Sequence, residues 1–306
     1  MSENPADYLL TVRDMLRYAV SRFNEAELEF GHGVSGLVDD AVYLILETLH
    51  LPIDEVNPWL DARLTGTERQ LVVNRIETRV QTRVPTPYLV NKAYIHGIPF
   101  YIDQRVIVPR SFIGEILFSD RVGPESGSTL IPSPLQVASV ADICTGSGCL
   151  AILASMVFPN AEVDAVDLSP EALQVAAINV DQLGDGRVHL HEGDLFGPLT
   201  GRTYDLIITN PPYVDQEAME ALPPEYLAEP SMALDGGFDG LDIVRRILDS
   251  AAQHLNPGGG LLCEIGTGRE ILELDYPDLP FLWLDTAESE GEVFWLNADD
   301  LIARAQ

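Results

Sequence analysis

The sequence is poor in lysine and has no long apolar run, and each shortage argues against a class of protein. Lys92 is the single lysine among 18 Lys and Arg residues, which face 48 acidic residues and leave a formal net charge of −30. Nucleic-acid binding rests on neutralising phosphates with Lys and Arg, so we expect no direct binding to free DNA or RNA. No apolar run approaches the roughly 18 residues of a membrane-spanning helix, so we expect no association with a membrane.

The sequence also lacks the signatures of metal and disulfide proteins. Cys144, Cys149 and Cys263 are its three cysteines, and their spacing matches no metal motif. Of the six histidines, only His189 and His191 alternate on one strand face, and we interpret them as ordinary strand residues. No metal site is therefore predicted. The polar residues 1–7 lack the basic and apolar regions of a signal peptide, so we expect a cytoplasmic protein without disulfides.

Hydrophobic periodicity divides the chain into a helical part and an α/β part. Three segments with helical spacing predict an all-helical domain over residues 1–84. Alternating residues around Gly97 predict a β-hairpin within a linker of residues 85–120, and residues 121–306 are expected to form the third and largest part. The three segments with helical spacing are residues 7–23, 36–50 and 67–83.

After residue 135, predicted strands and helices alternate, which is typical of a doubly wound α/β sheet of about seven strands. Ligands of such sheets lie at the carboxyl ends of the strands. The predicted strands are residues 137–143, 162–167, 187–192, 204–209, 260–265, 281–285 and 292–296, and the predicted helices lie near residues 149–157, 170–183, 240–255 and 268–274.

A glycine loop follows the first of these strands and opens a helix. Gly146 and Gly148 allow a tight turn and a close approach to a ligand, and Ala151 completes the pattern G-x-G-x-x-A. The next strand ends on Asp167, 21 positions after Gly146, where a carboxylate can accept both hydrogen bonds of a ribose diol. A dinucleotide would satisfy the same pattern. Asp142 favours S-adenosyl-L-methionine, because a carboxylate there can receive an ammonium group, directly or through water, and would repel a pyrophosphate.

The tetrapeptide Asn210-Pro211-Pro212-Tyr213 follows the predicted strand 204–209. The prolines stiffen the turn, so the Asn210 side chain is aimed. The side-chain carbonyl of Asn210 and the carbonyl of Pro211 can accept both hydrogen bonds of one NH2 group, and Tyr213 can pack on its plane. The tetrapeptide therefore predicts a socket for an amide or amine nitrogen, although a proline-rich turn after a core strand would read similarly.

Together, Asp142–Gly148, Asp167 and Asn210–Tyr213 resemble the HemK-type protein-glutamine N5-methyltransferases. The segments Pro87–Tyr94 and Val106–Glu115 resemble the PrmB-type branch, which acts on a large-subunit ribosomal protein of the uL3 type. The release-factor branch typically has Pro-Arg-Pro where this chain has Pro109-Arg110-Ser111. The resemblance covers about residues 85 to 300.

This resemblance implies a class I methyltransferase fold, Rossmann-like, with strand order 3-2-1-4-5-7-6 and the last strand antiparallel. It also implies that the small helical domain, residues 1–84, docks the substrate, and that residues 121–306 bind S-adenosyl-L-methionine. The implied roles fall on three sets of residues. The cofactor contacts are Asp142, Thr145, Gly146, Ser147, Gly148, Asp167, Leu168, Asp194, Leu195 and Asn210, the catalytic residues are Asn210, Pro211 and Tyr213, and the substrate contacts are Asn210, Pro211, Pro212 and Tyr213.

Three functions remain open from the sequence. The first is methylation of a glutamine side chain in a large-subunit ribosomal protein, with a release factor as the alternative substrate. The second is adenine-N6 methylation of DNA, which uses a related socket but is disfavoured by the net charge of −30 and by the absence of a basic recognition domain. The third is a catalytically silent nucleotide-binding or ribosome-assembly module. The negative charge favours a basic protein partner, and an acidic proteome would explain it equally well.

Overall fold

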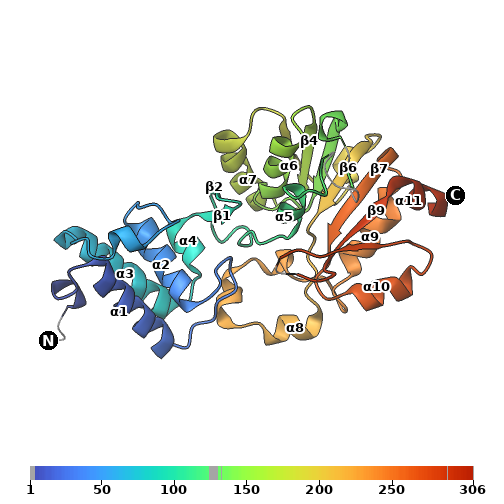
Figure 1. Cartoon of the computed structure of the whole chain (residues 1–306). Coiled ribbons are helices and arrows are strands. Elements are labelled where there is room, and N and C mark those ends of the chain that lie inside the picture. Colours follow the sequence, from blue (N-terminus) through green and yellow to red (C-terminus); the bar gives the residue numbers. More distant parts are fainter. Residues whose placement is uncertain (1–3, 124–129, 132, 288, 306) are drawn as a thin grey trace. The chain divides into compact units, whose positions relative to one another are not determined.

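The structure is a computed structural model that describes residues 4–123, 130–131, 133–287 and 289–305 (Figure 1). The chain divides into two compact units. The first comprises residues 4–93 together with the short segments 102–104 and 222–228, and the second comprises the other described residues. No helix in the described ranges is long and apolar enough to cross a membrane.

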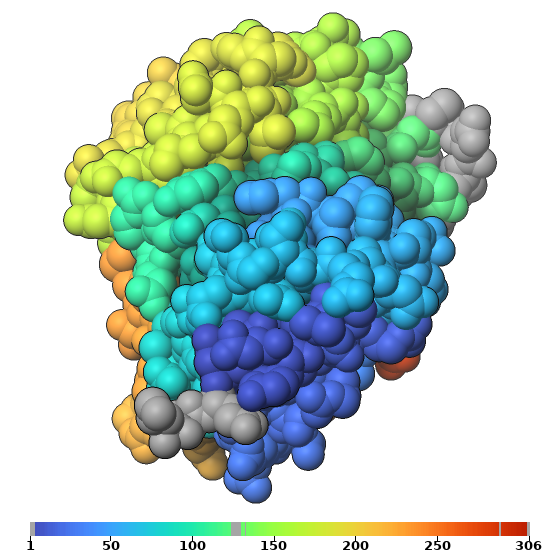
Figure 2. All heavy atoms as spheres, turned by 90° about the vertical axis from the view of Figure 1, so that its left-hand side faces the viewer, coloured from blue at the N-terminus to red at the C-terminus, as the bar shows by residue number. Residues whose placement is uncertain are grey.

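The first unit is helical, and the surface of its residues 4–93 is blue to cyan in Figure 2. Side chains from three long helices, among them Phe23, Leu44 and Ile76, form its core. The predicted helix 7–23 begins later than expected, at residue 12, because the Thr11 side chain accepts the N–H of Asp14 while the Asp14 carboxylate accepts the N–H of Thr11. The helices of this unit are η1 (Pro5–Asp7), α1 (Val12–Glu25), α2 (Leu37–Thr48), η2 (Asn57–Trp59), α3 (Gly66–Thr82), α4 (Thr86–Val90) and η5 (Pro224–Ala228).

The β-hairpin predicted from the alternation of residues 94–108 is shorter in the structure: it consists of β1 (Ala93–Ile95) and β2 (Ile98–Phe100), which pair with each other, and residues 101–108 form no strand. The second unit contains a sheet of seven strands in the order β5-β4-β3-β6-β7-β9-β8. In chain order this is 3-2-1-4-5-7-6, and β9 runs antiparallel to β7, so the implied class I methyltransferase topology is confirmed. The strands are β3 (Ser139–Ile143), β4 (Glu162–Asp167), β5 (Val188–Glu192), β6 (Tyr204–Thr209), β7 (Leu255–Glu264), β8 (Leu282–Leu284) and β9 (Val293–Asn297).

Helices cover both faces of this sheet (Figure 1). The central strands are buried on both sides and therefore appear in the sequence as apolar runs, for example Leu206 to Ile208 in β6. One apolar cluster contains Leu153 and Phe158 against one face, and a second contains Ile247 and Leu301 against the other. The helices of this unit are α5 (Ile113–Leu117), η3 (Pro134–Gln136), α6 (Cys149–Val157), α7 (Pro170–Leu183), η4 (Gly197–Leu199), α8 (Gln216–Ala221), η6 (Ser231–Ala233), α9 (Asp242–Ala251), α10 (Arg269–Asp275) and α11 (Ala298–Ala305).

The parallel register brings the predicted site residues to one edge. Ile143 of β3 lies opposite Val166 of β4 and Thr209 of β6, so the chain leaves these strands at the same level. Asp167 and Asn210 each lie one residue beyond a member of this row. The carboxyl edge of the sheet therefore carries the glycine loop, the end of β4 and the Asn-Pro-Pro-Tyr turn together.

Candidate active site

Asn210 stands where β6 ends, and its side chain borders a cavity of about 440 Å³. Thr209, just before it, is fully buried and donates its hydroxyl to the carbonyl of Ile143 at 2.7 Å, which fixes the end of the strand. The side-chain oxygen of Asn210 is buried and has no hydrogen-bond partner in the described part of the chain. A buried acceptor of this kind is costly unless something pairs with it, so the oxygen is ready for a donor.

Tyr213 is held at its hydroxyl. The phenol donates a hydrogen bond to Oε1 of Glu264 at 2.9 Å. Burial, followed by the nearby Glu264 carboxylate, raises the pKa of Tyr213, so the phenol keeps its proton. The Tyr213 hydroxyl is therefore a neutral donor with a fixed acceptor.

Gly146 of the glycine loop borders the same cavity. A Cβ built on this residue would meet no atom within 4 Å, so its backbone faces open space where a ligand fits. Its N–H donates to Oδ2 of Asp167 at 2.8 Å, and the N–H of Ser169 donates to Oδ1 at 2.9 Å. Burial raises the pKa of Asp167 above its ordinary value. The carboxylate is thus aimed by two backbone groups and lies at the cavity wall.

Asp142 lies beneath the loop and is fully buried. Its Oδ2 accepts the hydroxyl of Thr145 at 2.5 Å and the N–H of Ala151 at 3.0 Å. Its Oδ1 is buried and has no hydrogen-bond partner within the described ranges. Burial raises the pKa of Asp142 to about 7. The side chain therefore supports the loop directly, and its contact with an ammonium group stays a prediction.

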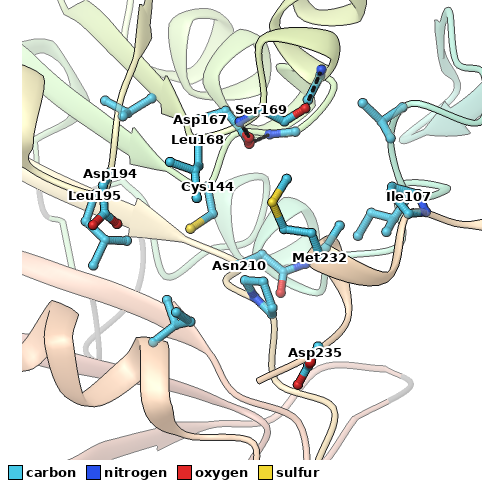
Figure 3. Close-up of a pocket in the computed structure, with 18 of the residues that line it drawn as sticks. Ile107, Cys144, Asp167, Leu168, Ser169, Asp194, Leu195, Asn210, Met232 and Asp235 are labelled. Carbon is cyan, nitrogen blue, oxygen red and sulfur yellow. Dashed lines mark hydrogen bonds between the residues drawn. The ribbon is translucent and has the colours of Figure 1, made fainter. Parts of the chain in front are cut away.

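The cavity has two further walls (Figure 3). On one, Oδ2 of Asp194 pairs with Nη2 of Arg246 at 2.6 Å, and both side chains are about half exposed. The other is formed by residues 230–233 and is fastened by Glu229. The buried Glu229 carboxylate accepts both ends of the Arg110 guanidinium, at 2.7 and 2.9 Å, and the N–H of Val108 at 2.9 Å. This bidentate pair is geometrically specific and stiffens the wall.

Seven of the thirteen predicted site residues line the cavity, and the other six do not. Several lining residues were not predicted. Cys144 lies inside the glycine loop and could have been inferred from its position, whereas Arg246 comes from a distant helix, α9, that carries no local signal. The predicted residues that line the cavity are Gly146, Asp167, Leu168, Asp194, Leu195, Asn210 and Pro212, and those outside the lining are Asp142, Thr145, Ser147, Gly148, Pro211 and Tyr213.

Comparisons with known proteins agree with this geometry. The family Methyltransferase small domain matches residues 117–267. The chain is 58% identical to the ribosomal protein uL3 glutamine methyltransferase of Bradyrhizobium diazoefficiens, over 96% of this chain and 92% of that one. It is 50% identical to the proteins of the same name from Burkholderia pseudomallei, over the full length of both, and from Neisseria gonorrhoeae, over 99% of each.

Proposed function

Because the chain belongs to the family of the ribosomal protein uL3 glutamine methyltransferases, we propose that it methylates the side-chain nitrogen of a glutamine in uL3. The observation that carries the chemistry is the buried, unpartnered oxygen of Asn210 at the wall of the cavity. A glutamine side-chain amide presents two N–H donors in one plane. One N–H would donate to the side-chain oxygen of Asn210, and the other would donate to the carbonyl of Pro211, the next residue in the chain.

The cavity suits the cofactor of this family. When bound, S-adenosyl-L-methionine supplies a methyl group on a positively charged sulfur. The open face at Gly146 and the carboxylate of Asp167 would hold its ribose part, and Leu195 and Asp194 its adenine. Asp142 would act on the ammonium group directly or through water. Thr145, Ser147, Gly148 and Leu168 complete the cofactor-binding residues in this proposal.

The residues of the socket act by positioning. An amide nitrogen is a poor nucleophile because its lone pair is delocalised into the carbonyl. Asn210 and Pro211 hold its two protons, and Tyr213 and Pro212 clamp the plane, so the remaining electron density points one way. Positioning of this kind can contribute up to about 7 to 11 kcal/mol. As the bond between the methyl group and the cofactor's sulfur broke, the nitrogen would take up the methyl group and lose one proton to solvent, so these residues need supply no general base.

The partner and the division of labour follow from the same proposal. A net charge of −30 suits a basic protein substrate and opposes free nucleic acid. Residues 1–84 would dock the ribosomal protein, and residues 121–306 would catalyse the methyl transfer. Residues 85–120 would link these two domains. The reaction would take place in the cytoplasm.

A methyl-transfer assay tests the proposal. Purified chain and methyl-labelled cofactor are incubated separately with uL3, with a release factor and with plasmid DNA, and modified protein is mapped by mass spectrometry. We expect label on a glutamine of uL3 alone. Label on the release factor or on DNA adenine would replace the proposal with the corresponding alternative, and no label on any substrate would indicate a silent module.

Within that assay, Asn210→Ala should lower kcat by at least about 100-fold, because the amide is no longer aimed. Cofactor affinity, measured by calorimetry, should stay within a few-fold of wild type. Near-normal turnover of this variant would contradict the assignment of Asn210 to the substrate socket.

A further inference from the structure

We propose that Glu264 is the positioning residue of the substrate socket, fixing the ring of Tyr213 through the phenol hydroxyl while Ser111 and the backbone of Phe112 fix Glu264. This inference rests on the proposed function, because it concerns the clamp on the substrate amide. Glu264 acts through Tyr213 and touches no substrate atom. The Asn-Pro-Pro-Tyr pattern does not identify Glu264, Ser111 or Phe112. Glu264 lies 51 residues and Ser111 102 residues away from Tyr213 in sequence.

Glu264 lies at the carboxyl edge of the sheet, where the Asn-Pro-Pro-Tyr turn also lies. It is the last residue of β7, and the residue before it, Cys263, pairs in parallel register with Thr209 of β6. Glu264 is therefore level with Asn210, on the neighbouring strand. Its side chain is only 1% exposed. A carboxylate so placed is part of the wall behind the socket.

Both oxygens of this carboxylate are used. Oε2 accepts the hydroxyl of Ser111 at 2.7 Å and the N–H of Phe112 at 2.9 Å, and Oε1 accepts the hydroxyl of Tyr213 at 2.9 Å. Ser111 is itself oriented, because its oxygen accepts the N–H of Ile113 at 3.2 Å. The four groups form a chain from the start of α5 to the aromatic ring.

Stability alone does not account for this arrangement. All three donors are neutral, and Glu264 forms no ion pair with Arg or Lys in the described part of the chain. Burying an ionisable group without a countercharge is expensive, and an apolar side chain of similar size would serve the fold better. Burial raises the pKa of Glu264 to about 7, which shows the cost of keeping it ionised. A buried acid kept at the ligand edge of the sheet is typical of a functional role.

The rest of Tyr213 is confined by glycines, so its hydroxyl is the last point to fix. A Cβ on Gly266, whose φ is +56°, would lie 2.8 Å from Cδ2 of the ring. A Cβ on Gly240 would lie 2.4 Å from the backbone oxygen of Tyr213. Only glycine permits these approaches. Tyr213 is thus confined along the Cδ2–Cε2 side of its ring and at its backbone, and Glu264 fixes the hydroxyl.

A double-mutant cycle tests the proposal on the full chain with uL3 and S-adenosyl-L-methionine. Tyr213→Phe keeps the ring and removes the hydroxyl, and Glu264→Gln keeps the size and removes the charge. We expect each single variant to lower kcat by about 10-fold, the lower end for a hydrogen bond to a charged group. Because both act through one bond, the double variant should match the single ones within about twofold. The KM for cofactor should not change.

Ser111→Ala provides a second route if Glu264→Gln fails to fold, because it removes one support of the carboxylate and leaves Tyr213 in place. Its loss of kcat should also vanish in the Tyr213→Phe background. Tyr204→Phe is the matched control, since the Tyr204 hydroxyl donates to Asp164 at 2.8 Å on the same sheet but away from the socket. It should leave kcat unchanged.

Losses that multiply in the double variant, or an unchanged kcat in both Glu264→Gln and Ser111→Ala, would overturn the proposal. A loss confined to thermal stability, with kcat intact, would do the same. Failure of the proposed function would look different, because the wild-type chain itself would then transfer no methyl group to uL3 glutamine.

Discussion

At the scale of single residues, the carboxyl edge of the sheet is organised by buried and half-buried carboxylates that accept hydrogen bonds from the surrounding segments. Asp167 holds two backbone N–H groups, Asp142 holds the glycine loop and the start of α6, and Glu264 holds the Tyr213 ring. Burial raises the pKa of all three. Each therefore costs stability and fixes a piece of the site, as preorganised sites require.

Asp167→Ala should weaken the binding of S-adenosyl-L-methionine by about 10- to 150-fold, because hydrogen bonds to a charged group contribute roughly 1.5 to 3 kcal/mol. Titration calorimetry measures the change. Glu162→Gln is the matched control, since Glu162 lies on the same strand and is exposed. Equal affinities for wild type and Asp167→Ala would exclude the ribose role.

The pKa of Glu264, raised to about 7, predicts a pH dependence of turnover. Above pH 7 the Glu264 carboxylate is ionised and accepts a charge-assisted hydrogen bond from the hydroxyl of Tyr213. Below pH 7 the carboxyl group is protonated, and the hydrogen bond becomes one between neutral groups. Because charge-assisted hydrogen bonds are roughly twice as strong as neutral ones, kcat should fall about 5-fold as pH drops from 8 to 6.

Four charged or titratable groups lie around Glu264, namely Tyr213, Cys263, Glu292 and Arg110. Among them, Glu292 is the carboxyl group whose pKa is also raised. Asp142 has a pKa near the same value, so the measurement is the difference between the profiles of wild type and Glu264→Gln. The two profiles should diverge around pH 7. Parallel profiles would assign the dependence to Asp142 or Glu292.

At the scale of elements, sequence patterns predicted what is local and missed what is long-range. The bounds of β4, β6, α6 and α7 agree with the prediction, since buried strands and amphipathic helices carry their own periodicity. Strand β7 begins five residues earlier than predicted, at Leu255, because its first residues include three glycines that no apolar pattern reveals. The hydrogen bond from Ser111 to Glu264 spans 153 residues, and no local pattern encodes such a contact.

A second long-range element is the segment Leu222–Ala228, which follows α8 and belongs to the helical unit. Glu225 is fully buried there. Its Oε1 accepts Nη2 of Arg83 at 2.8 Å and the N–H of Glu29 at 3.1 Å, and Arg79 lies 4.0 Å away. Downstream of the Asn-Pro-Pro-Tyr turn, the chain therefore enters the helical unit, where the ion pair between Glu225 and Arg83 acts as its anchor.

Glu225→Ala should destabilise the helical unit by roughly 1.5 to 3 kcal/mol, because it removes the charged hydrogen bond between the Glu225 carboxylate and the Arg83 guanidinium. Thermal unfolding measures this loss, and limited proteolysis should cut the released segment near residues 222–228. Glu220→Gln, an exposed change in the preceding α8, is the control and should have no effect. An unaltered melting temperature for Glu225→Ala would show that the anchor is not structural.

At the scale of the whole molecule, negative charge accumulates along the chain. The net charge is −5 for residues 1–100, −9 for residues 101–200 and −16 for residues 201–306. The last third contains the Asn-Pro-Pro-Tyr turn, so the negative charge is greatest in the third of the sequence that carries the socket. Such a field raises the association rate of a basic partner by roughly 10- to 1000-fold. An acidic proteome would produce the charge without this effect.

Salt separates the two explanations. Attraction between exposed charges is screened beyond about 8 Å at physiological ionic strength and more strongly at higher salt. If the charge serves recognition, kcat/KM for intact uL3 should fall steeply as salt rises, whereas kcat/KM for a short neutral glutamine peptide should hardly change. The peptide is the control, because it uses the same socket without the long-range field. Equal slopes for the two substrates would assign the acidity to the proteome, and a steep slope for uL3 alone would assign it to the docking of a basic partner.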